Sequence, residues 1–148
     1  MASAEQNGYC IATMSSKHRL IELPQRADTR GALTFAQQGD HIPFAVKRFF
    51  AIYSVTEGAG RGAHAHRAQH QFLVMLAGNA AVTVDDGTTR MQVVLDRPSL
   101  ALHAPPMLWL ELENFSADAI CMVLASDVYS ESDYIRDRLE FLRLANGT

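Results

Sequence analysis

The feature that most constrains the fold of this chain is a series of short apolar segments, each ended by turn residues. Between residues 18 and 126, β-branched and aromatic side chains are frequent in these segments, and Gly, Pro, Asn and Asp separate them. Asp86-Gly87 in particular predicts a hairpin. We expect about nine strands, which favours an all-β antiparallel sandwich or barrel: HRLIELP, GALTFA, FAVKRFFAIYSV, QFLVML, AAVTV, RMQVVL, SLALHA, LWLEL and AICMVLAS.

The spacing of the apolar residues changes near the C-terminus. In SDYIRDRLEFLRLA the residues Ile135, Leu139 and Leu142 fall at helical spacing, and Ser132 is a candidate N-cap. We predict a C-terminal helix that covers the sheet and keeps its arginines in solvent.

Composition narrows the class of protein further. A chain of 148 residues predicts one domain, here residues 18–148 after a mobile leader over 1–17. A net charge of −3 with 48% apolar residues gives no indication of a nucleic-acid partner or of disorder. Cys10 and Cys121 show no ligand spacing and are interpreted as free thiols. The absence of a signal-like or long apolar run predicts a cytoplasmic protein without a membrane partner.

The tripeptide His64-Ala65-His66 carries most of the functional information. Residues i and i+2 of a strand face the same side, so both imidazoles point together, into the lumen if the strand lines a barrel. The glycines just before them, Gly58, Gly60 and Gly62, indicate a bend or a close backbone approach.

The spacing around these histidines resembles the first motif of the cupin superfamily. Gly58 precedes His64 by six residues, and Gln71 follows His66 by five, at the position where that motif has an acid. The later segment HAPPMLWLELEN has no histidine after its prolines. A metal needs three or four converging ligands, and His70 could supply a third only if it shares the face of His66. Three interpretations remain: a metal site, structural histidines, and the one we favour, a metal-free acid/base pair titrating near neutral pH.

Several blocks together resemble the sugar 3,4-ketoisomerases, which act on dTDP-linked 4-keto-6-deoxy-glucose. The resemblance covers residues 18–142 and includes LPQRADTRGALTF, IPFAVKRFFAIYSV, RGAHAHRAQHQFLVMLAGNAAVTVDDG, PPMLWLELENFS and VLASDVYSESDYIRD. It implies a cupin-type antiparallel β-barrel (jelly roll) and no cofactor. It also implies a homodimer that exchanges N-terminal strands. The pathway would be deoxysugar biosynthesis for a lipopolysaccharide, S-layer or antibiotic glycan.

The resemblance also implies roles for individual residues. His64 and His66 would be the base and acid of an enediol mechanism, with His64 the first choice for the C3 proton. Tyr53, expected on the preceding strand of the same sheet, would be a proton shuttle. Arg61 would hold an oxyanion or a phosphate oxygen. The remaining substrate-binding candidates are Lys47 and Arg48 as cations, Trp109 or Phe49 as a stacking surface, and Gln71.

Two further residues resemble one branch of the family. Arg30 precedes the glycine of the G-x-L segment and His103 precedes the two prolines, which together imply a galacto-configured 3-keto product. The chain lacks the acid that the family often has near Ala36 and Gln37, so its sugar contacts can differ.

Three other functions compete with this interpretation. One is a nucleotide-sugar 3,5-epimerase-like cupin, which uses a His base but moves no carbonyl. The second is a metal-dependent cupin such as a dioxygenase. The third is a non-enzymatic nucleotide-sugar-binding cupin, which would have no need of two titratable groups side by side.

Overall fold

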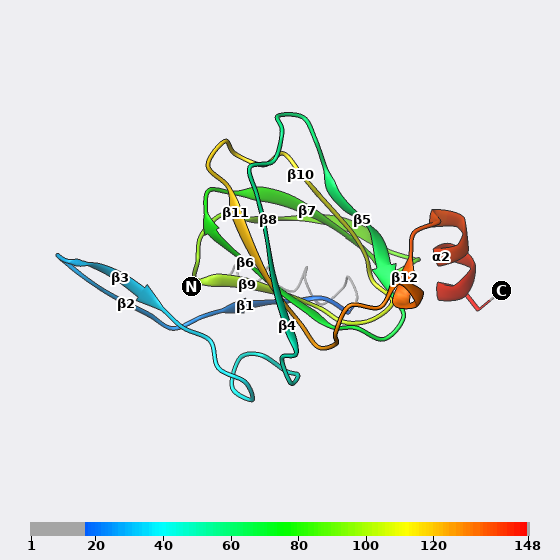
Figure 1. The fold of residues 1–148 in the computed structure, drawn as a ribbon, viewed down its shortest axis with the longest axis horizontal. Helices are drawn as coiled ribbons and strands as arrows, with labels where there is room; N and C mark the ends of the chain where they lie inside the picture. The colour runs from blue at the N-terminus through cyan, green and yellow to red at the C-terminus, as the bar shows by residue number, and fades with distance from the viewer. Residues whose placement is uncertain (1–16, 148) are drawn as a thin grey trace, which may run out of the picture.

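Two five-stranded antiparallel sheets face each other in the computed structural model, which describes residues 17–147 (Figure 1). The first sheet has the order β1 (Arg19–Glu22), β9 (Leu100–Ala104), β6 (Gln71–Ala77), β11 (Ile120–Ala125), β4 (Arg48–Tyr53). The second has the order β12 (Tyr134–Ile135), β5 (Arg61–His66), β10 (Trp109–Glu113), β7 (Ala80–Asp85), β8 (Arg90–Leu95). The prediction of an all-β, cupin-type fold is confirmed.

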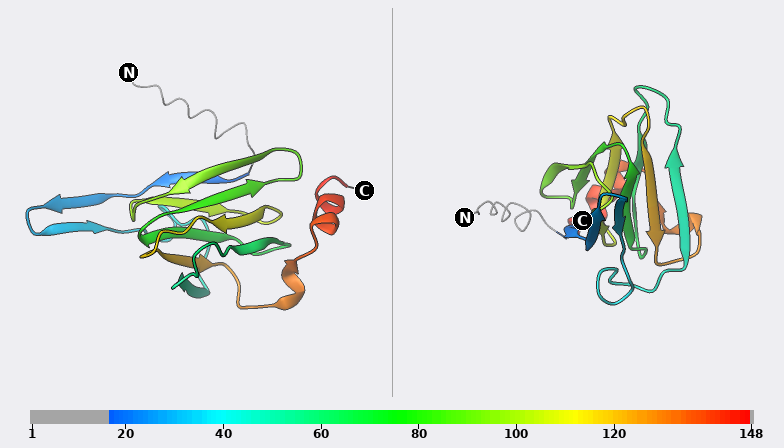
Figure 2. Two further views of the ribbon diagram at one scale, coloured as in Figure 1. Left: turned by 90° about the horizontal axis from the view of Figure 1, so that it is seen from above. Right: turned by 90° about the vertical axis from the view of Figure 1, so that its left-hand side faces the viewer.

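A separate ribbon and a terminal helix complete the fold. The ribbon consists of β2 (Gln25–Asp28) and β3 (Gly31–Thr34), and it extends away from the two sheets (Figure 1). The helix α2 (Arg138–Ala145) lies at the opposite end of the molecule from the ribbon, as Figure 1 and the left view of Figure 2 show. No helix of residues 17–147 is long and apolar enough to cross a membrane.

The main core fills the space between the two sheets. Alternate residues of the strands point inward, as the period of two requires, so that Leu73 and Met75 of β6 meet Val82 and Val84 of β7. The hairpin predicted at Asp86-Gly87 joins β7 to β8. The Asp86 carboxylate accepts from the N–H groups of Thr88 and Thr89, both at 2.8 Å, which confirms that prediction.

A second apolar cluster covers the outer face of the first sheet. Phe72, Val74 and Ala101 point away from the main core and pack against Ile42 and Phe44 of the segment before β4. The outer face of this sheet is therefore partly covered by the chain itself.

The C-terminal segment departs from the predicted helix. Glu131–Asp133 form one turn of 3₁₀-helix and Tyr134–Ile135 pair with β5, so α2 begins only after Asp137, whose side chain accepts from the Leu139 N–H. Ser132 is not the N-cap, and Ile135 is a buried strand residue. The cause is long-range pairing: residues that have helical spacing are held instead by hydrogen bonds to a strand almost 70 residues earlier.

The helix covers the sheet as predicted, but the face that it buries is the one with Phe141 and not the one with Leu139. Phe141 is fully buried against Trp109, Ala65 and Ile135, whereas Leu139 is 75% exposed. The prediction that its arginines are solvated is wrong for Arg138, which bonds the buried Asp85. Cys121 is a buried free thiol, and Cys10 and the leader lie outside the described residues apart from Lys17.

Candidate active site

A cavity of about 880 Å³ opens between the two sheets. Its apolar wall comes from inward-facing residues of the main core, among them Phe50, Leu73 and Leu110. Its polar lining includes Tyr53, Arg61, His64, Gln71, Tyr134 and Arg136. These polar side chains come from four strands and the segment after β12, so folding brings together groups that are far apart in sequence.

Backbone geometry on β5 brings the two histidines to this cavity. Gly62 and Ala63 have φ angles of 89° and 62°, and the register with β10 shifts between Leu110 and Glu111. A Cβ on Gly62 would lie 3.1 Å from the Leu110 carbonyl oxygen, so this approach favours glycine. Beyond the irregularity the strand alternates normally.

His64 and His66 lie on the same side of β5, as the alternation predicted. Their ring centroids are 5.0 Å apart and the rings meet edge to face at 89°. Ala65 between them is completely buried on the other side, against Ile135 and Phe141.

His64 is a half-buried imidazole on the cavity wall. Burial, followed by the charge of the neighbouring His66, lowers the pKa of His64 to about 4. The ring is therefore neutral at neutral pH and has a lone pair that can accept a proton from a bound molecule.

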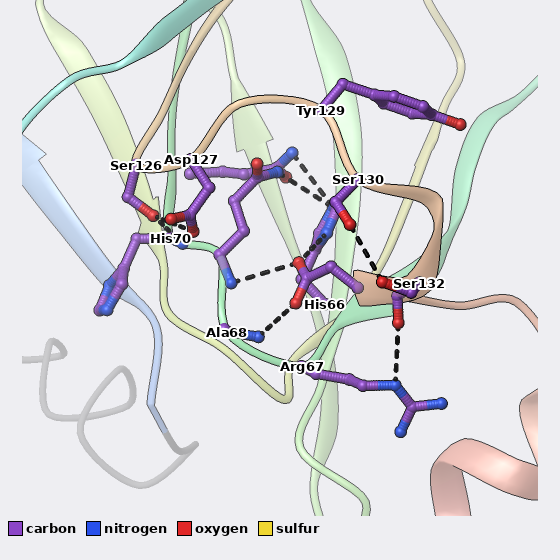
Figure 3. Close-up of polar contacts among 12 residues, drawn as sticks. His66, Arg67, Ala68, His70, Ser126, Asp127, Tyr129, Ser130 and Ser132 are labelled. Carbon is purple, nitrogen blue, oxygen red and sulfur yellow. Dashed lines mark hydrogen bonds and ion pairs between the residues drawn. The ribbon is translucent and has the colours of Figure 1, made fainter.

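His66 is more deeply buried, with 5% of its surface exposed. Its Nδ1 lies 3.0 Å from the Asp133 carboxylate, and its Nε2 lies 3.4 Å from the amide nitrogens of both Gln69 and Gln71 (Figure 3). Burial lowers the pKa of His66, and the bond to Asp133 opposes that shift without outweighing it. Both ring nitrogens of this histidine thus have protein partners.

Tyr134 is the aromatic residue closest to the histidine pair. It pairs with His66 across β12 and β5, and its ring centroid lies 4.9 Å from His64 and 4.4 Å from His66. The Arg136 guanidinium lies 4.2 Å from the Tyr134 ring centroid and bonds Glu131 through Nε and Nη2, at 2.8 and 3.0 Å. Tyr134 and Arg136 were not predicted from the sequence as site residues, because their segment was assigned to the helix. The signal that could have found them is the VYSESDYIRD block, which is part of the family resemblance.

Tyr53 lines the cavity from a different position than expected. It ends β4, which belongs to the first sheet and not to the sheet of β5, so the prediction of a shared sheet is wrong. Its side chain is 66% exposed, which places it near the solvent end of the cavity and not against the histidines.

Among the substrate-binding candidates, Arg61 and Gln71 line the cavity. Arg48 lies behind it, where Nη2 donates to Gln69 Oε1 at 3.1 Å and the guanidinium lies over the Phe50 ring. These three residues lie in or next to the site.

The other five candidates lie outside the lining of this chain's own cavity. Phe49 is 60% exposed on β4. Trp109 packs on Phe141 under α2 and donates to Glu111. His103 stacks on His70 on the outer face of the first sheet, next to Phe44. Lys47 is exposed before β4. Arg30 lies in the turn of the β2–β3 ribbon, paired with Asp28.

The same geometry answers the question about a third metal ligand. His70 contacts His103, with Nδ1 and Nε2 3.0 Å apart, on the face opposite to His66. Residues 17–147 contain no group of three or more His, Cys, Asp or Glu side chains arranged to hold a metal ion. The groups around His64 and His66 are two amides, a phenol, the Asp133 carboxylate and the Arg136 guanidinium, which suit hydrogen bonding to a polar ligand.

The sequence matches one family of known proteins over most of its length. Residues 16–146 match the family described as FdtA: WxcM-like, C-terminal. The chain belongs to this family. It is 39% identical over 120 residues to the TDP-4-oxo-6-deoxy-alpha-D-glucose-3,4-oxoisomerase of Aneurinibacillus thermoaerophilus, covering 81% of this chain and 86% of that protein.

Solved structures agree with this assignment. A 3,4-ketoisomerase from Helicobacter canadensis is 38% identical with a TM-score of 0.84, over 88% of this chain and 98% of that one. The QdtA sugar 3,4-ketoisomerase from Thermoanaerobacterium thermosaccharolyticum, in complex with TDP, is 32% identical with a TM-score of 0.85, over 88% and 95% of the two chains. A mutant of QdtA has been solved with TDP-4-keto-6-deoxyglucose. The resemblance to the sugar 3,4-ketoisomerases is thereby confirmed.

Proposed function

We propose that this enzyme converts dTDP-4-keto-6-deoxy-D-glucose into the dTDP-linked 3-keto-6-deoxy sugar. The observation that carries the proposal is His64, a neutral imidazole with a pKa near 4 on the wall of a roughly 880 Å³ cavity, in a member of this family. A cavity of this size accommodates a ligand as large as a nucleotide sugar at least in part.

The reaction needs a base and groups that move protons between oxygens. The C4 carbonyl acidifies the hydrogen on C3, and a base that removes it leaves an enediolate. Returning the proton to C4, and moving the hydroxyl proton from O3 to O4, transfers the carbonyl to C3. Carbon C3 is oxidised and C4 is reduced within one molecule, so the electrons balance without an external oxidant or reductant.

The residues of the cavity can divide these tasks. His64 takes the C3 proton and returns it to C4. Tyr134, whose ring contacts both histidines, supplies a phenol that can donate to or accept from the sugar oxygens. Tyr53 offers a second phenol nearer to solvent. Arg61 provides a cation for an oxyanion or for the diphosphate.

The β2–β3 ribbon supports the proposal of a homodimer with exchanged N-terminal segments. A two-stranded ribbon is marginally stable alone, and this one carries Leu33, 58% exposed, with Phe35 just beyond it. Exchange would bury these side chains on a second copy. It would also give Arg30 a route into the partner's cavity, since Arg30 lies away from the cavity of its own chain.

The same proposal includes expectations about metal dependence, cellular role and product configuration. The reaction would proceed without a metal, since Gln71 takes the position of the cupin acid. The enzyme would act in the cytoplasm on a deoxysugar destined for a lipopolysaccharide, S-layer or antibiotic glycan. The galacto configuration would rest on Arg30 and His103, both of which lie outside the cavity of their own chain.

Product analysis by NMR tests the proposal against its alternatives. Incubation with dTDP-4-keto-6-deoxyglucose should move the carbonyl signal from C4 to C3. Inversion at C3 or C5 with the carbonyl still at C4 would indicate an epimerase. Tight binding of TDP with no change in the sugar would indicate a binding protein, and either result would refute the proposal.

A further inference from the structure

The hydrogen bonds around His66 have a definite polarity that starts at Arg48. A guanidinium can only donate, and Nη2 of Arg48 lies 3.1 Å from Oε1 of Gln69. The Gln69 oxygen is therefore the acceptor, and the amide NH₂ of Gln69 is the group that faces His66, 3.4 Å from Nε2. Since an NH₂ group can only donate, Nε2 of His66 carries a lone pair and no hydrogen.

The opposite side of the ring leads to the same tautomer. Asp133 accepts from the Ala68 N–H at 2.7 Å through Oδ1 and from the Gln69 N–H at 3.3 Å through Oδ2. Both of these contacts use the side chain as an acceptor, and an ionised carboxylate can only accept. The nitrogen 3.0 Å away, Nδ1 of His66, must then hold the hydrogen.

We infer that Asp133 is a positioning residue that holds His66 as the neutral Nδ1–H tautomer, leaving His64 as the only imidazole that exchanges a proton with the substrate. The role given to His64 rests on the proposed function, whereas the tautomer of His66 does not. The inference revises the expectation from the sequence, in which the two histidines act as an equal base and acid.

The placement of the two rings supports this division. His64 lies on the cavity wall, whereas His66 is 5% exposed and has partners on both nitrogens. The ring centroid of His66 lies 5.0 Å from that of His64 and 4.4 Å from that of Tyr134, so His66 packs against both. Besides these neighbours, the charges that act on His66 are Asp133, Arg48 and Arg136. Between pH 6.5 and 8 a neutral His66 adds no positive charge beside the base, and the two imidazoles repel each other only at the acid pH where both would be protonated.

Long-range ¹⁵N NMR of the substrate-free, histidine-labelled protein reads the tautomer directly. We expect His66 to carry its hydrogen on Nδ1 between pH 6.5 and 8. Asp133→Ala should mix the tautomers, whereas Asp137→Ala, which removes a nearby carboxylate from the helix N-cap, should not. An Nε2–H signal in the wild type, or an unchanged tautomer in Asp133→Ala, would overturn the inference. The wild-type spectrum decides the tautomer alone, so a misfolded variant leaves that part of the test intact.

A pair of variants tests the consequence for turnover. The amide nitrogen of Asn can occupy the position of Nδ1 and still donate to Asp133, whereas that of Gln lies nearer the position of Nε2. His66→Asn should therefore keep the removal of the C3 hydrogen, followed in heavy water as exchange with solvent or transfer to C4, at a cost of roughly 10²-fold or less from mispositioning, and His66→Gln should lose more. His64→Asn should abolish both exchange and transfer. Equal loss of C3–H removal in His66→Asn and His64→Asn would refute the division of roles. If the tautomer is found but no carbonyl moves in the wild type, only the proposed function fails.

Discussion

The acid side of the pH–rate profile gives a quantitative test of His64 that requires no mutation. A general base must be unprotonated, and burial together with the adjacent His66 lowers the pKa of His64 from 6.5 to about 4. The profile of kcat/KM reports groups of the free enzyme. We therefore expect kcat/KM to stay level as the pH falls through 6.5 and to decline only as the pH approaches 4.

The effect is already large at pH 5.5. There a base with a pKa of about 4 is about 97% neutral, whereas a base with an ordinary pKa of 6.5 is only about 9% neutral, a difference of about tenfold in rate. Initial rates with dTDP-4-keto-6-deoxyglucose between pH 4.5 and 8 measure it. An inflection near 6.5 in folded protein would refute the assignment of His64 as a buried neutral base.

Folding must be followed at the same pH values. The pKa values of His64 and His103 are both lowered to about 4, so below pH 6.5 the unfolded chain binds protons that the folded chain does not. Their contribution to stability is complete above pH 6.5 and is lost as the pH falls from 6.5 toward 4. Circular dichroism at each pH separates this loss of fold from protonation of the base.

Three other outcomes follow from the structure. Activity should survive prolonged EDTA treatment, and loss that a divalent ion restores would show that a metal joins the histidines. Light scattering at micromolar concentration should give about twice the chain mass of 16.3 kDa, and a monomer would contradict the exchange of the β2–β3 ribbon. Phe141→Ala, at a fully buried position, should lower the free energy of unfolding by about 3–5 kcal/mol. Leu139→Ala, at a position 75% exposed on the same helix, should change it by less than about 0.5 kcal/mol, and equal losses in urea denaturation would show that the helix does not pack through Phe141.

Local sequence signals were sufficient to predict most of the strands and the shared orientation of the two histidines. The hairpin at Asp86-Gly87 is encoded by the turn itself, and the shared orientation of His64 and His66 follows from the strand period. β2 was missed, because its sequence QRAD has no apolar alternation and pairs only with its neighbour β3.

The period of a strand does not say which of its two faces points inward. His103 and Trp109 lie on outward faces, because Leu102 and Leu110 occupy the core positions beside them. Both side chains therefore point away from the cavity of their own chain.

Contacts across the whole chain were also invisible in the sequence. Asp133 bonds His66 from 67 residues away, and Tyr134 reaches both imidazoles through a two-residue strand. Their helical spacing was misleading because pairing with β5 overrides local propensity.

The most direct test of the central claim is hydrogen exchange at C3 in the His64→Asn variant, measured by NMR with dTDP-4-keto-6-deoxyglucose in heavy water and compared with wild type. The account predicts that the wild type produces the 3-keto sugar. His64→Asn should bind TDP with an unchanged Kd, neither exchange nor transfer the C3 hydrogen, and turn over at least roughly 10²-fold more slowly. Turnover within a few-fold of wild type in His64→Asn would contradict it, and would show that the imidazole on the cavity wall is structural.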